Sequence, residues 1–333
     1  MMFDRRRLIV PVLLALSPGC NANPKIVGVG RDAASVPADT APVPTDGEGL
    51  PPAGLPPPVD AGAPADTAPA GPAPSEFTRT ESGGYKLGPA LTAEPPGAGP
   101  ASGSQGCTTI VGAMRDFKGA NEPGGHPDFE AFQGSTPTTG LVAPRLGADG
   151  KPVYSSQCET AAHNAACPFG QMTTSKQRFD QWYRAADGVN KAFVIYFLFD
   201  TAGPVSTFSS SHFFPLDNAG WGNSGTDTSG ASHNFGFTTE LHMMFKYNGG
   251  EHFTFTGDDD LWVFVNGTLA MDLGGLHPPA TGTIDLDGMA AALAITRGQI
   301  YPIELFHAER HTQASNFRVD TNLAFTDCGK VIQ

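Results

Sequence analysis

Proline and aromatic residues divide the chain into two parts that cannot share one kind of structure. Seventeen of the 30 prolines lie in residues 21–105, where the aromatic side chains are Phe77 and Tyr85 alone. Residues 106–333 hold 28 aromatic side chains. A segment with so few apolar side chains cannot offset the entropy of ordering its backbone. We therefore predict a disordered, partly polyproline linker over 21–105 and a folded region over 106–333, long enough for one large β domain or two small ones.

The first 20 residues have the pattern of an export signal. Three arginines at 5–7 precede an apolar stretch over 8–16, which is shorter than the roughly 20 residues that cross a bilayer. The stretch is followed by Ser-Pro-Gly-Cys20, which resembles the lipobox of bacterial lipoproteins, where the cysteine is acylated. We predict a lipoprotein signal peptide over 1–20 and export to the outer membrane or cell surface, with a lipid anchor on Cys20. An ordinary secretory signal with a chance cysteine is the alternative.

Charge narrows the set of partners. The formal net charge is −13, and residues 106–333 alone carry −10. An acidic surface repels phosphate backbones, so nucleic acid is excluded as a partner. Such a surface favours solubility or the binding of hard cations. No membrane-spanning segment is expected, so the lipid anchor is the expected membrane contact.

Cysteine usage agrees with export. Apart from Cys20, the chain has Cys107 and Cys328 near the two ends of the folded region, and Cys158 and Cys167 within it. Four thiols allow three pairings. We favour Cys107–Cys328, which clamps the ends of the domain, and Cys158–Cys167, which closes a small loop. Because no Cys-x-x-Cys pair is present, these four cysteines are a poor metal site.

Short apolar runs separated by glycine turns predict an all-β fold. Asn266-Gly267 lies between two such runs and is a strong hairpin signal, because a type I′ turn needs positive φ at both central residues. The continuous apolar run Phe193–Phe199 suits a strand buried on both faces. Further strands are expected at Leu241–Tyr247, His252–Thr256, Leu261–Val265 and Leu269–Leu273. Many strands without alternating helices indicate an antiparallel sandwich or barrel.

Two further elements complete the expected architecture. Tyr301–Ala308 and Asn316–Phe325 are expected to form a hairpin, and the alternation in the second run leaves one of its faces in water. One short helix is predicted, N-capped by Thr174-Ser175 and ending near Gly188.

Three consecutive aspartates form the sharpest local feature, Gly257-Asp258-Asp259-Asp260, in a turn between two expected strands. Adjacent carboxylates repel each other when they are partly desolvated, and they are costly to bury. A hard cation such as calcium, which takes about six to eight oxygen ligands and tolerates irregular loops, would resolve both problems. A solvated acidic turn is the alternative, and the three residues alone do not decide between the two.

A second group of polar residues follows near the C-terminus. His307, Glu309 and His311 would share one face if the expected strand continues through them. Such a face could bind zinc or iron with an open position, although a hydrogen-bonded rim is the more common arrangement. The helical His-Glu-x-x-His pattern of metalloproteases is absent. Arg310 could pair with the acidic turn, which would weaken a cation site rather than build one.

Other residues carry weaker signals. Trp221 and Trp262 could stack on sugar rings, although core or turn packing is the more common role of such side chains. Asp285 and Asp287 could serve acid–base chemistry, as could many pairs in an acidic chain. No Gly-x-Ser-x-Gly or Gly-x-x-x-x-Gly-Lys motif is present. The sequence offers no complete catalytic set, so we do not expect an enzyme.

An ordered series of sequence blocks runs through the folded region. The blocks include MRDFKG at Met114–Gly119, FDQWYRAADGVN at Phe179–Asn190, FFPLDNAGWG at Phe213–Gly222, YNGGEHFTFTGDDDLWVFVNGTLAMDLGGLHPP at Tyr247–Pro279 and YPIELFHAERHTQASNFRVDT at Tyr301–Thr321. This series resembles the fibro-slime domain and covers about Cys107 to Cys328, two-thirds of the chain. That family is related to the protective-antigen-type (PA14) β-sandwich of adhesins, glycosidases and toxins. The resemblance implies a PA14-like sandwich over 106–333.

The resemblance also implies a calcium site at the acidic turn. In calcium-dependent adhesins of the wider superfamily, two adjacent aspartates joined by a cis peptide hold the calcium that ligates sugar hydroxyls. Asp258-Asp259 and the Asn-Gly pair of the expected hairpin fit the spacing of that pattern, although Asp260 stands where a glycine is common. Glu309 stands where the second calcium loop supplies an asparagine. The implied metal ligands are Asp258, Asp259, Asp260 and Glu309.

The same resemblance implies a binding function. We expect a lipid-anchored, stalked module that binds a glycan or matrix polysaccharide, or a surface protein, in a calcium-dependent way. The expected ligand contacts are Trp221, Trp262, Arg310 and His311. A structural matrix or protein-interaction domain without a small-ligand site is the alternative. A carbohydrate-active or metal-dependent hydrolase is less favoured.

Overall fold

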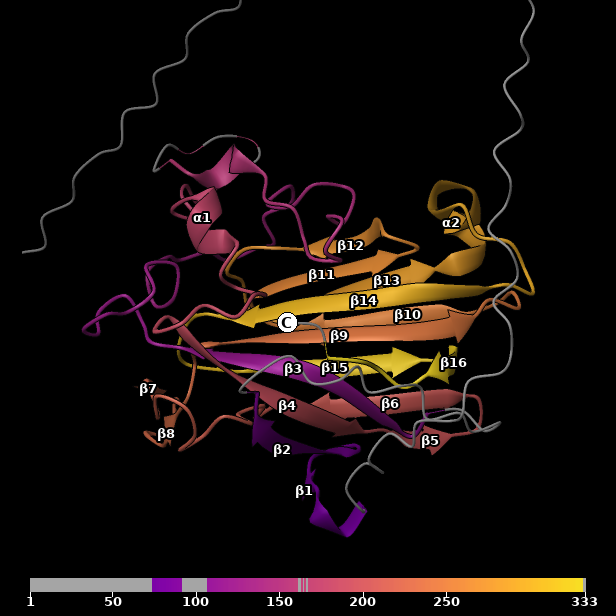
Figure 1. Cartoon of the computed structure of the whole chain (residues 1–333), viewed down its shortest axis with the longest axis horizontal. Coiled ribbons are helices and arrows are strands. Elements are labelled where there is room, and N and C mark those ends of the chain that lie inside the picture. Colours follow the sequence, from indigo (N-terminus) through magenta and orange to yellow (C-terminus); the bar gives the residue numbers. More distant parts are fainter. Residues whose placement is uncertain (1–73, 92–106, 161–162, 164, 166, 332–333) are drawn as a thin grey trace, which may run out of the picture. The chain divides into compact units, whose positions relative to one another are not determined.

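Two antiparallel β-sheets face each other in the folded part of the chain (Figure 1). The computed structural model describes residues 74–91, 107–160, 163, 165 and 167–331, which belong to one compact unit, Ala63–Gln333. The predicted signal peptide, Cys20 and most of the predicted linker lie outside the described residues. Within the described residues, no helix is long and apolar enough to cross a membrane.

The larger sheet has nine strands among the described residues, in the order β1-β2-β4-β3-β9-β14-β11-β12, with β16 also paired to β9. Their bounds are β1 Thr78–Arg79, β2 Gly84–Ala90, β3 Thr109–Phe117, β4 Asn190–Leu198, β9 Phe237–Lys246, β11 Asp260–Val265, β12 Thr268–Leu273, β14 Ile300–Glu309 and β16 Ala324–Asp327.

The smaller sheet has the order β13-β10-β15-β6-β5, and a short hairpin, β7–β8, stands apart from both sheets. The bounds are β5 Asp200–Ala202, β6 Val205–Ser210, β7 Gly225–Thr226, β8 Ser232–His233, β10 His252–Gly257, β13 Ala280–Asp285 and β15 Phe317–Thr321. The helical elements of the described residues are η1 Pro74–Glu76, η2 Ser156–Cys158, α1 Lys176–Phe179 and α2 Leu286–Leu293.

The main core lies between the two sheets and is rich in phenylalanine. Phe197 of β4 packs against Phe208 of β6, with ring centroids 5.0 Å apart, and against Phe317 of β15 at 5.5 Å. Phe255 of β10 meets Phe317 edge to face at 5.0 Å. Each buried phenylalanine of this kind contributes about 1.5–3 kcal/mol through burial. The all-β sandwich expected from the sequence is confirmed.

A second core covers the outer face of the larger sheet. Phe179 and Trp182, in the segment that joins β3 to β4, pack against Trp262 of β11, with centroids 5.9 and 6.3 Å apart. Tyr183 of the same segment meets Phe306 of β14 at 5.0 Å. The larger sheet is therefore buried on both faces in this region, which explains why its strands are apolar without strict alternation.

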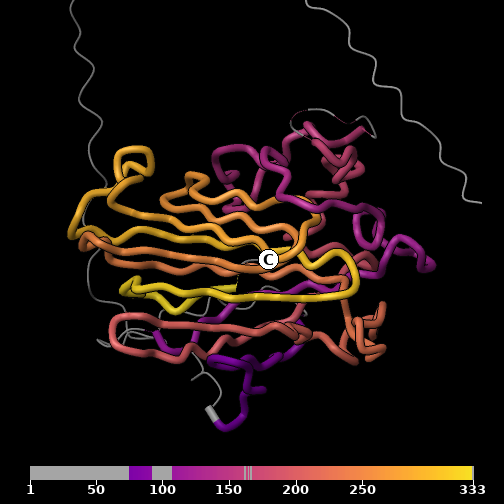
Figure 2. Tube along the Cα trace, turned by 180° about the vertical axis from the view of Figure 1, so that it is seen from behind, coloured from indigo at the N-terminus to yellow at the C-terminus, as the bar shows by residue number. Residues whose placement is uncertain are grey.

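Several strands begin or end at one end of the larger sheet, and this end carries the functional loops. The register pairs Phe117 at the end of β3 with Asn190 at the start of β4. It also pairs Glu309 at the end of β14 with Phe237 at the start of β9, next to Asp260 at the start of β11. Figure 2 shows the connections of this end gathered beyond the strands.

The predicted hairpin at Asn266-Gly267 is confirmed. β11 and β12 pair antiparallel, Val265 lies opposite Thr268, and the two turn residues have φ of +51° and +65°. The predicted hairpin of Tyr301–Ala308 with Asn316–Phe325 is wrong. β14 pairs with β11 and β9, whereas β15 pairs with β10 and β6 in the other sheet, because the chain crosses between the sheets after β14.

The helices are partly as expected. Ser175 caps α1, and its side chain accepts a hydrogen bond from the Arg178 backbone N–H at 3.3 Å, but the helix ends at Phe179. α2 was not expected from the sequence. Asp285 is its N-cap and accepts from the backbone N–H groups of Asp287 and Gly288 at 3.1 and 3.3 Å, so capping accounts for Asp285.

The structure also bears on the predicted linker over 21–105 and on the predicted disulfides. Strand β2, which lies in the range 21–105, pairs with β4, so this part of the range belongs to the sheet. Both favoured disulfides are present. Cys107 and Cys328 have Cα atoms 5.3 Å apart, and Cys158 and Cys167 have Cα atoms 5.7 Å apart.

Candidate functional site

The acidic turn carries the chain from one sheet to the other. It joins β10 of the smaller sheet to β11 of the larger sheet. Asp258, Asp259 and Asp260 expose 5, 6 and 0% of their surface. Asp259 has a φ of +57°, in the left-handed region. The turn is therefore buried, and the alternative of a solvated acidic turn is wrong.

Asp260 is part of a buried ion pair and faces away from any external ligand. Its Oδ2 accepts from Arg310 Nε at 2.6 Å and its Oδ1 accepts from the Gly275 backbone N–H at 2.6 Å. Both side chains of the pair are fully buried. Arg310 had been expected to contact ligand, and Asp260 to bind metal. Both expectations are corrected: each group neutralises the other in the interior, as the sequence had left open for Arg310.

The remaining contacts of Arg310 are also internal. Its Nη1 donates to the carbonyl oxygens of Asp128 at 2.9 Å and Met172 at 3.2 Å. Its guanidinium lies 4.5 Å from the ring centroid of Trp182. The arginine therefore ties the end of β14 to the segment between β3 and β4.

Asp258 and Asp259 are buried and accept hydrogen bonds from the chain that follows β14. Asp258 accepts from the Asn316 backbone N–H at 2.6 Å and from its Nδ2 at 2.7 Å. Asp259 accepts from the Arg310 backbone N–H at 2.7 Å. Burial raises the pKa of Asp258, and burial together with the neighbouring aspartates raises the pKa of Asp259 to about 7 despite the charge of Arg310. The protein makes the anionic form of this pair costly.

Glu309 is the most unusual acidic group in the described residues. It is fully buried at the end of β14, beside Ser315 and Asp259, and neither carboxylate oxygen forms a hydrogen bond of good geometry with a described residue. Burial, followed by the charges of Asp259 and Asp258, raises its pKa well above its usual range. An unpartnered buried carboxylate is destabilising unless a proton or a cation compensates it.

His307 lies on the same face of β14 as Glu309, as predicted. Its ring is fully buried, 5.2 Å from the ring of Phe317, and neither nitrogen has a hydrogen-bond partner. Burial lowers its pKa to about 3, so the ring is neutral. His311 follows after the strand has ended and does not continue this face.

The aspartate pair opens onto a pocket of about 390 Å³. One wall is apolar and the others carry histidine, amide and hydroxyl groups. The lining residues are Gln133, Gly134, Asp258, Asp259, Leu276, His277, Pro278, Pro279, His311, Thr312, Gln313 and Ala314. His311 is thus placed beside the aspartates, as expected. His277 and Gln133 were not found from the sequence, because they come from separate loops that share no spacing with the acidic turn.

The two tryptophans do not join this pocket. Trp262 is fully buried in the outer core, and its Nε1 donates to Asp272 Oδ1 at 3.0 Å, so it cannot stack on an external sugar. Trp221 is half-buried, its backbone N–H donates to Asp116, and its ring lies 3.9 Å from Lys191 Nζ. Trp221 does not line the pocket, so its expected ligand contact there is also corrected.

The donor set fits a hard cation in its chemistry. Asp258 and Asp259 supply carboxylate oxygens at the pocket, and Glu309 does not line it. Within the described residues, no three His, Cys, Asp or Glu side chains are arranged to hold a metal ion. Backbone carbonyls, amides or water would therefore have to complete the coordination shell. The cis peptide bond of the described residues joins Thr312 and Gln313, not the aspartate pair as the resemblance implied.

Comparison with known proteins assigns the C-terminal part of the chain. Residues 198–331 match the model of the PA14 domain. Protein psiD of Dictyostelium discoideum is 40% identical over 192 residues, which is 56% of this chain and 36% of psiD. Protein psiC of the same organism is 35% identical over 212 residues, which is 61% of this chain and 39% of psiC.

The chain spans little more than a third of the length of these two relatives. A crystal structure of the PA14 domain of MpAFP antifreeze protein has a TM-score of 0.24 and 10% identity, and covers 40% of this chain and 79% of that one. The match over residues 198–331, together with the antiparallel sandwich, confirms the expected resemblance to PA14 domains.

Proposed function

We propose that this chain is an exported binding and adhesion module that takes a carbohydrate or an extracellular polymer in the 390 Å³ pocket, with calcium held there by the carboxylates of Asp258 and Asp259. PA14 domains are carbohydrate-binding and adhesion modules. The observation that carries the proposal is the buried pair Asp258 and Asp259, whose side chains both line the pocket and whose charges reach the buried carboxylate of Glu309.

A divalent cation would offset most of the negative charge that these carboxylates carry when ionised. Burial raises the pKa of Asp258, Asp259 and Glu309, and a doubly charged ion beside them would favour their ionised forms. Bound calcium would supply direct coordination of ligand hydroxyl groups. The chain's own residues shape the rest of the site. Leu276, Pro278 and Pro279 offer an apolar wall for the face of a sugar ring.

Calcium titration with a matched charge control tests the metal. We expect calcium to raise the melting temperature of the metal-free full chain, because a ligand that binds the folded state stabilises it. The double variant Asp258→Asn/Asp259→Asn should lose this response. Asp187→Asn, an exposed aspartate far from the turn in sequence, should keep it. A melting temperature that calcium does not change would count against the metal.

A glycan array tests the ligand class. The wild-type chain should bind a subset of glycans in calcium and lose them in chelator, and the double aspartate variant should bind none. Binding that persists in chelator would show that glycan recognition does not need calcium. An array that stays blank in calcium would favour the alternative, a structural or protein-interaction domain without a small-ligand site.

We also propose that the module is held at the cell surface by a lipid on Cys20 and presented on the linker over 21–105. The support is the sequence pattern of the first 20 residues. Labelled palmitate should be incorporated into the wild-type chain and not into Cys20→Ala. If neither chain is labelled, the first 20 residues act as an ordinary secretory signal; equal labelling of both chains would place the lipid on a residue other than Cys20.

A further inference from the structure

The segment 118–189, between β3 and β4, lies outside the residues that match the PA14 model. Its described part nevertheless packs tightly on the larger sheet through the aromatic contacts of the outer core. Tight packing by itself indicates only that the segment shields the outer face of the larger sheet from water. Two further observations place it in the binding site.

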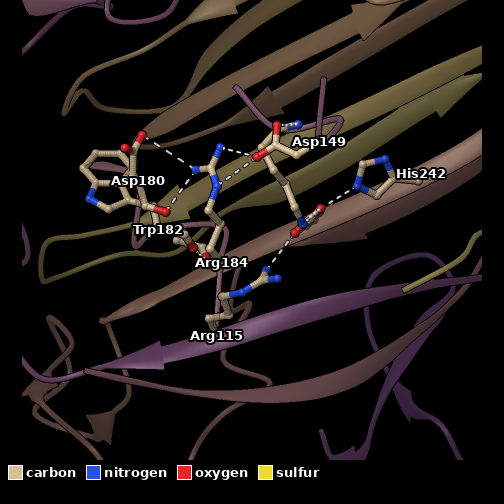
Figure 3. Close-up of polar contacts among 9 residues, drawn as sticks. Arg115, Asp149, Asp180, Trp182, Arg184 and His242 are labelled. Atoms are coloured by element: carbon tan, nitrogen blue, oxygen red, sulfur yellow. Dashed lines mark hydrogen bonds and ion pairs between the residues drawn. The ribbon is translucent and has the colours of Figure 1, made fainter. Parts of the chain in front are cut away.

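The first observation is a buried ionic anchor. Lys151 of the segment donates through Nζ to Glu240 of β9 at 2.5 Å, and Arg115 of β3 donates through Nη1 to the other carboxylate oxygen at 2.7 Å. Figure 3 shows Arg115 and His242 converging on this carboxylate. Burial alone would raise the pKa of Glu240, but the charge of Arg115 and the contacts of His242 and Lys151 lower it to about 2. The segment is therefore fixed in position over the sheet.

The second observation is direct contact with the pocket loop that follows β14. The Glu130 backbone N–H donates to the Arg310 carbonyl oxygen at 2.7 Å, and Glu130 Oε1 accepts from the Thr312 backbone N–H at 2.9 Å. Three residues later, Gln133 and Gly134 line the pocket itself. A Cβ on Gly134 would lie 2.0 Å from the Leu276 carbonyl oxygen, so this wall is packed directly against the loop that carries the apolar side of the pocket.

We infer that residues 130–134 of this segment form part of the binding site and that Gln133 is a specificity-determining residue for a neutral glycan. Gln133 is exposed and lines the same pocket as Gln313, which follows β14. A carboxamide offers both a donor and an acceptor, which suits ligand hydroxyl or acetamido groups. The inference rests on the proposed glycan binding and adds to it the residue, outside the PA14 match, that selects among glycans.

Binding of the full chain to the glycans that wild type selects on an array tests the inference. Gln133→Ala should bind its best glycan about three- to tenfold more weakly, the effect of losing a hydrogen bond, and should change the order of preference among glycans. Its melting temperature should equal that of wild type, because the side chain is exposed. Gln299→Ala, an exposed glutamine just before β14, is the matched control and should keep both affinity and preference.

The outcomes separate the inference from the proposed function. If wild type binds glycans and Gln133→Ala keeps the same affinities and order, the inference is wrong and the proposed function stands. If wild type binds no glycan in calcium, the proposed function is wrong and the inference falls with it. A selective loss in Gln133→Ala with unchanged folding supports both.

Discussion

Arg310 connects more of the fold than any side chain beside it in the pocket loop. Its buried guanidinium meets Asp260 of the acidic turn and the carbonyl oxygens of Asp128 and Met172 in the segment between β3 and β4. Its backbone N–H donates to Asp259 at 2.7 Å. One residue therefore sets the distance between the aspartate pair and the wall of the pocket opposite it.

Removing the guanidinium of Arg310 should lower the free energy of unfolding strongly. Arg310→Leu leaves Asp260 buried without its counter-charge, and such a change costs about 3–5 kcal/mol. The matched control is Arg318→Leu, which breaks the half-exposed pair with Asp320 and should cost at most about 1 kcal/mol. Urea unfolding of both variants measures the difference. Similar losses in the two variants would contradict the role assigned to Arg310.

Glu304 is a half-buried carboxylate that the proposed site does not use. It lies on β14 opposite His242 of β9 and Phe264 of β11, and its Oε2 has no hydrogen-bond partner. Burial raises its pKa to about 7, only partly offset by Lys330. The folded state therefore holds this proton more tightly than the unfolded state, whose carboxyl titrates near the ordinary value of 4.5.

The raised pKa of Glu304 makes the free energy of unfolding depend on pH. As pH rises from about 4.5 to about 7, the unfolded chain loses the proton first, so the free energy of unfolding falls across this window. Glu304→Gln should remove that loss and be about 1–3 kcal/mol more stable than wild type at pH 8, and equal to it near pH 4. Urea unfolding at several pH values checks this. A constant difference between the two proteins at every pH would show that Glu304 does not titrate as described.

At the level of single residues, sequence patterns identified the acidic turn but not the state of its members. Glu309 and Asp260 looked equivalent as acidic ligands, yet one is unpartnered and the other is neutralised by Arg310. Trp262 looked like an exposed ring candidate and is fully buried. Burial and pairing depend on which strands become neighbours, and the local sequence does not contain that information.

At the level of elements, local signals were reliable and long-range pairing was not. The β11–β12 hairpin formed as expected because Asn266-Gly267 specifies its turn within two residues. β14 and β15 were expected to pair because they are adjacent in sequence, yet they lie in different sheets. The short chain between them crosses the sandwich at the pocket. α2 was missed although its N-cap, Asp285, is a recognisable signal.

The segment between β3 and β4 should depend on its ionic anchor. Glu240→Ala removes the carboxylate that Arg115 and Lys151 share in the interior, and should cost about 3–5 kcal/mol. Asp149→Ala is the control, because it breaks an exposed pair with Arg184 in the same segment, also drawn in Figure 3, and should cost at most about 1 kcal/mol.

Hydrogen exchange locates this effect within the fold. In Glu240→Ala, amides of the described part of 118–189 should exchange faster than those of the smaller sheet, because the anchor holds the segment to the larger sheet. Uniformly faster exchange in both sheets would mean that Glu240 stabilises the whole domain and does not anchor the segment in particular.

At the level of the whole molecule, the two sheets are joined at one end by the acidic turn and the pocket loop, and the ends of the domain are joined elsewhere. Cys328, just after β16, is bonded to Cys107, just before β3. The Val111 backbone N–H donates to the Cys328 carbonyl oxygen at 2.8 Å. The C-terminal strand of the sandwich is thereby held to an N-terminal strand of the same sheet.

The two disulfides should differ in their effect on stability. Cys107–Cys328 spans 221 residues and Cys158–Cys167 spans nine, and the chain-entropy model assigns them about 5 and about 2.5 kcal/mol. Replacing the first pair with alanine should therefore lower the melting temperature more than replacing the second. Calorimetry of the two double variants, with the oxidised wild type as reference, measures the order. The reverse order would show that the closed loop around Cys158 stabilises the domain through contacts of its own, since loop length alone predicts the opposite.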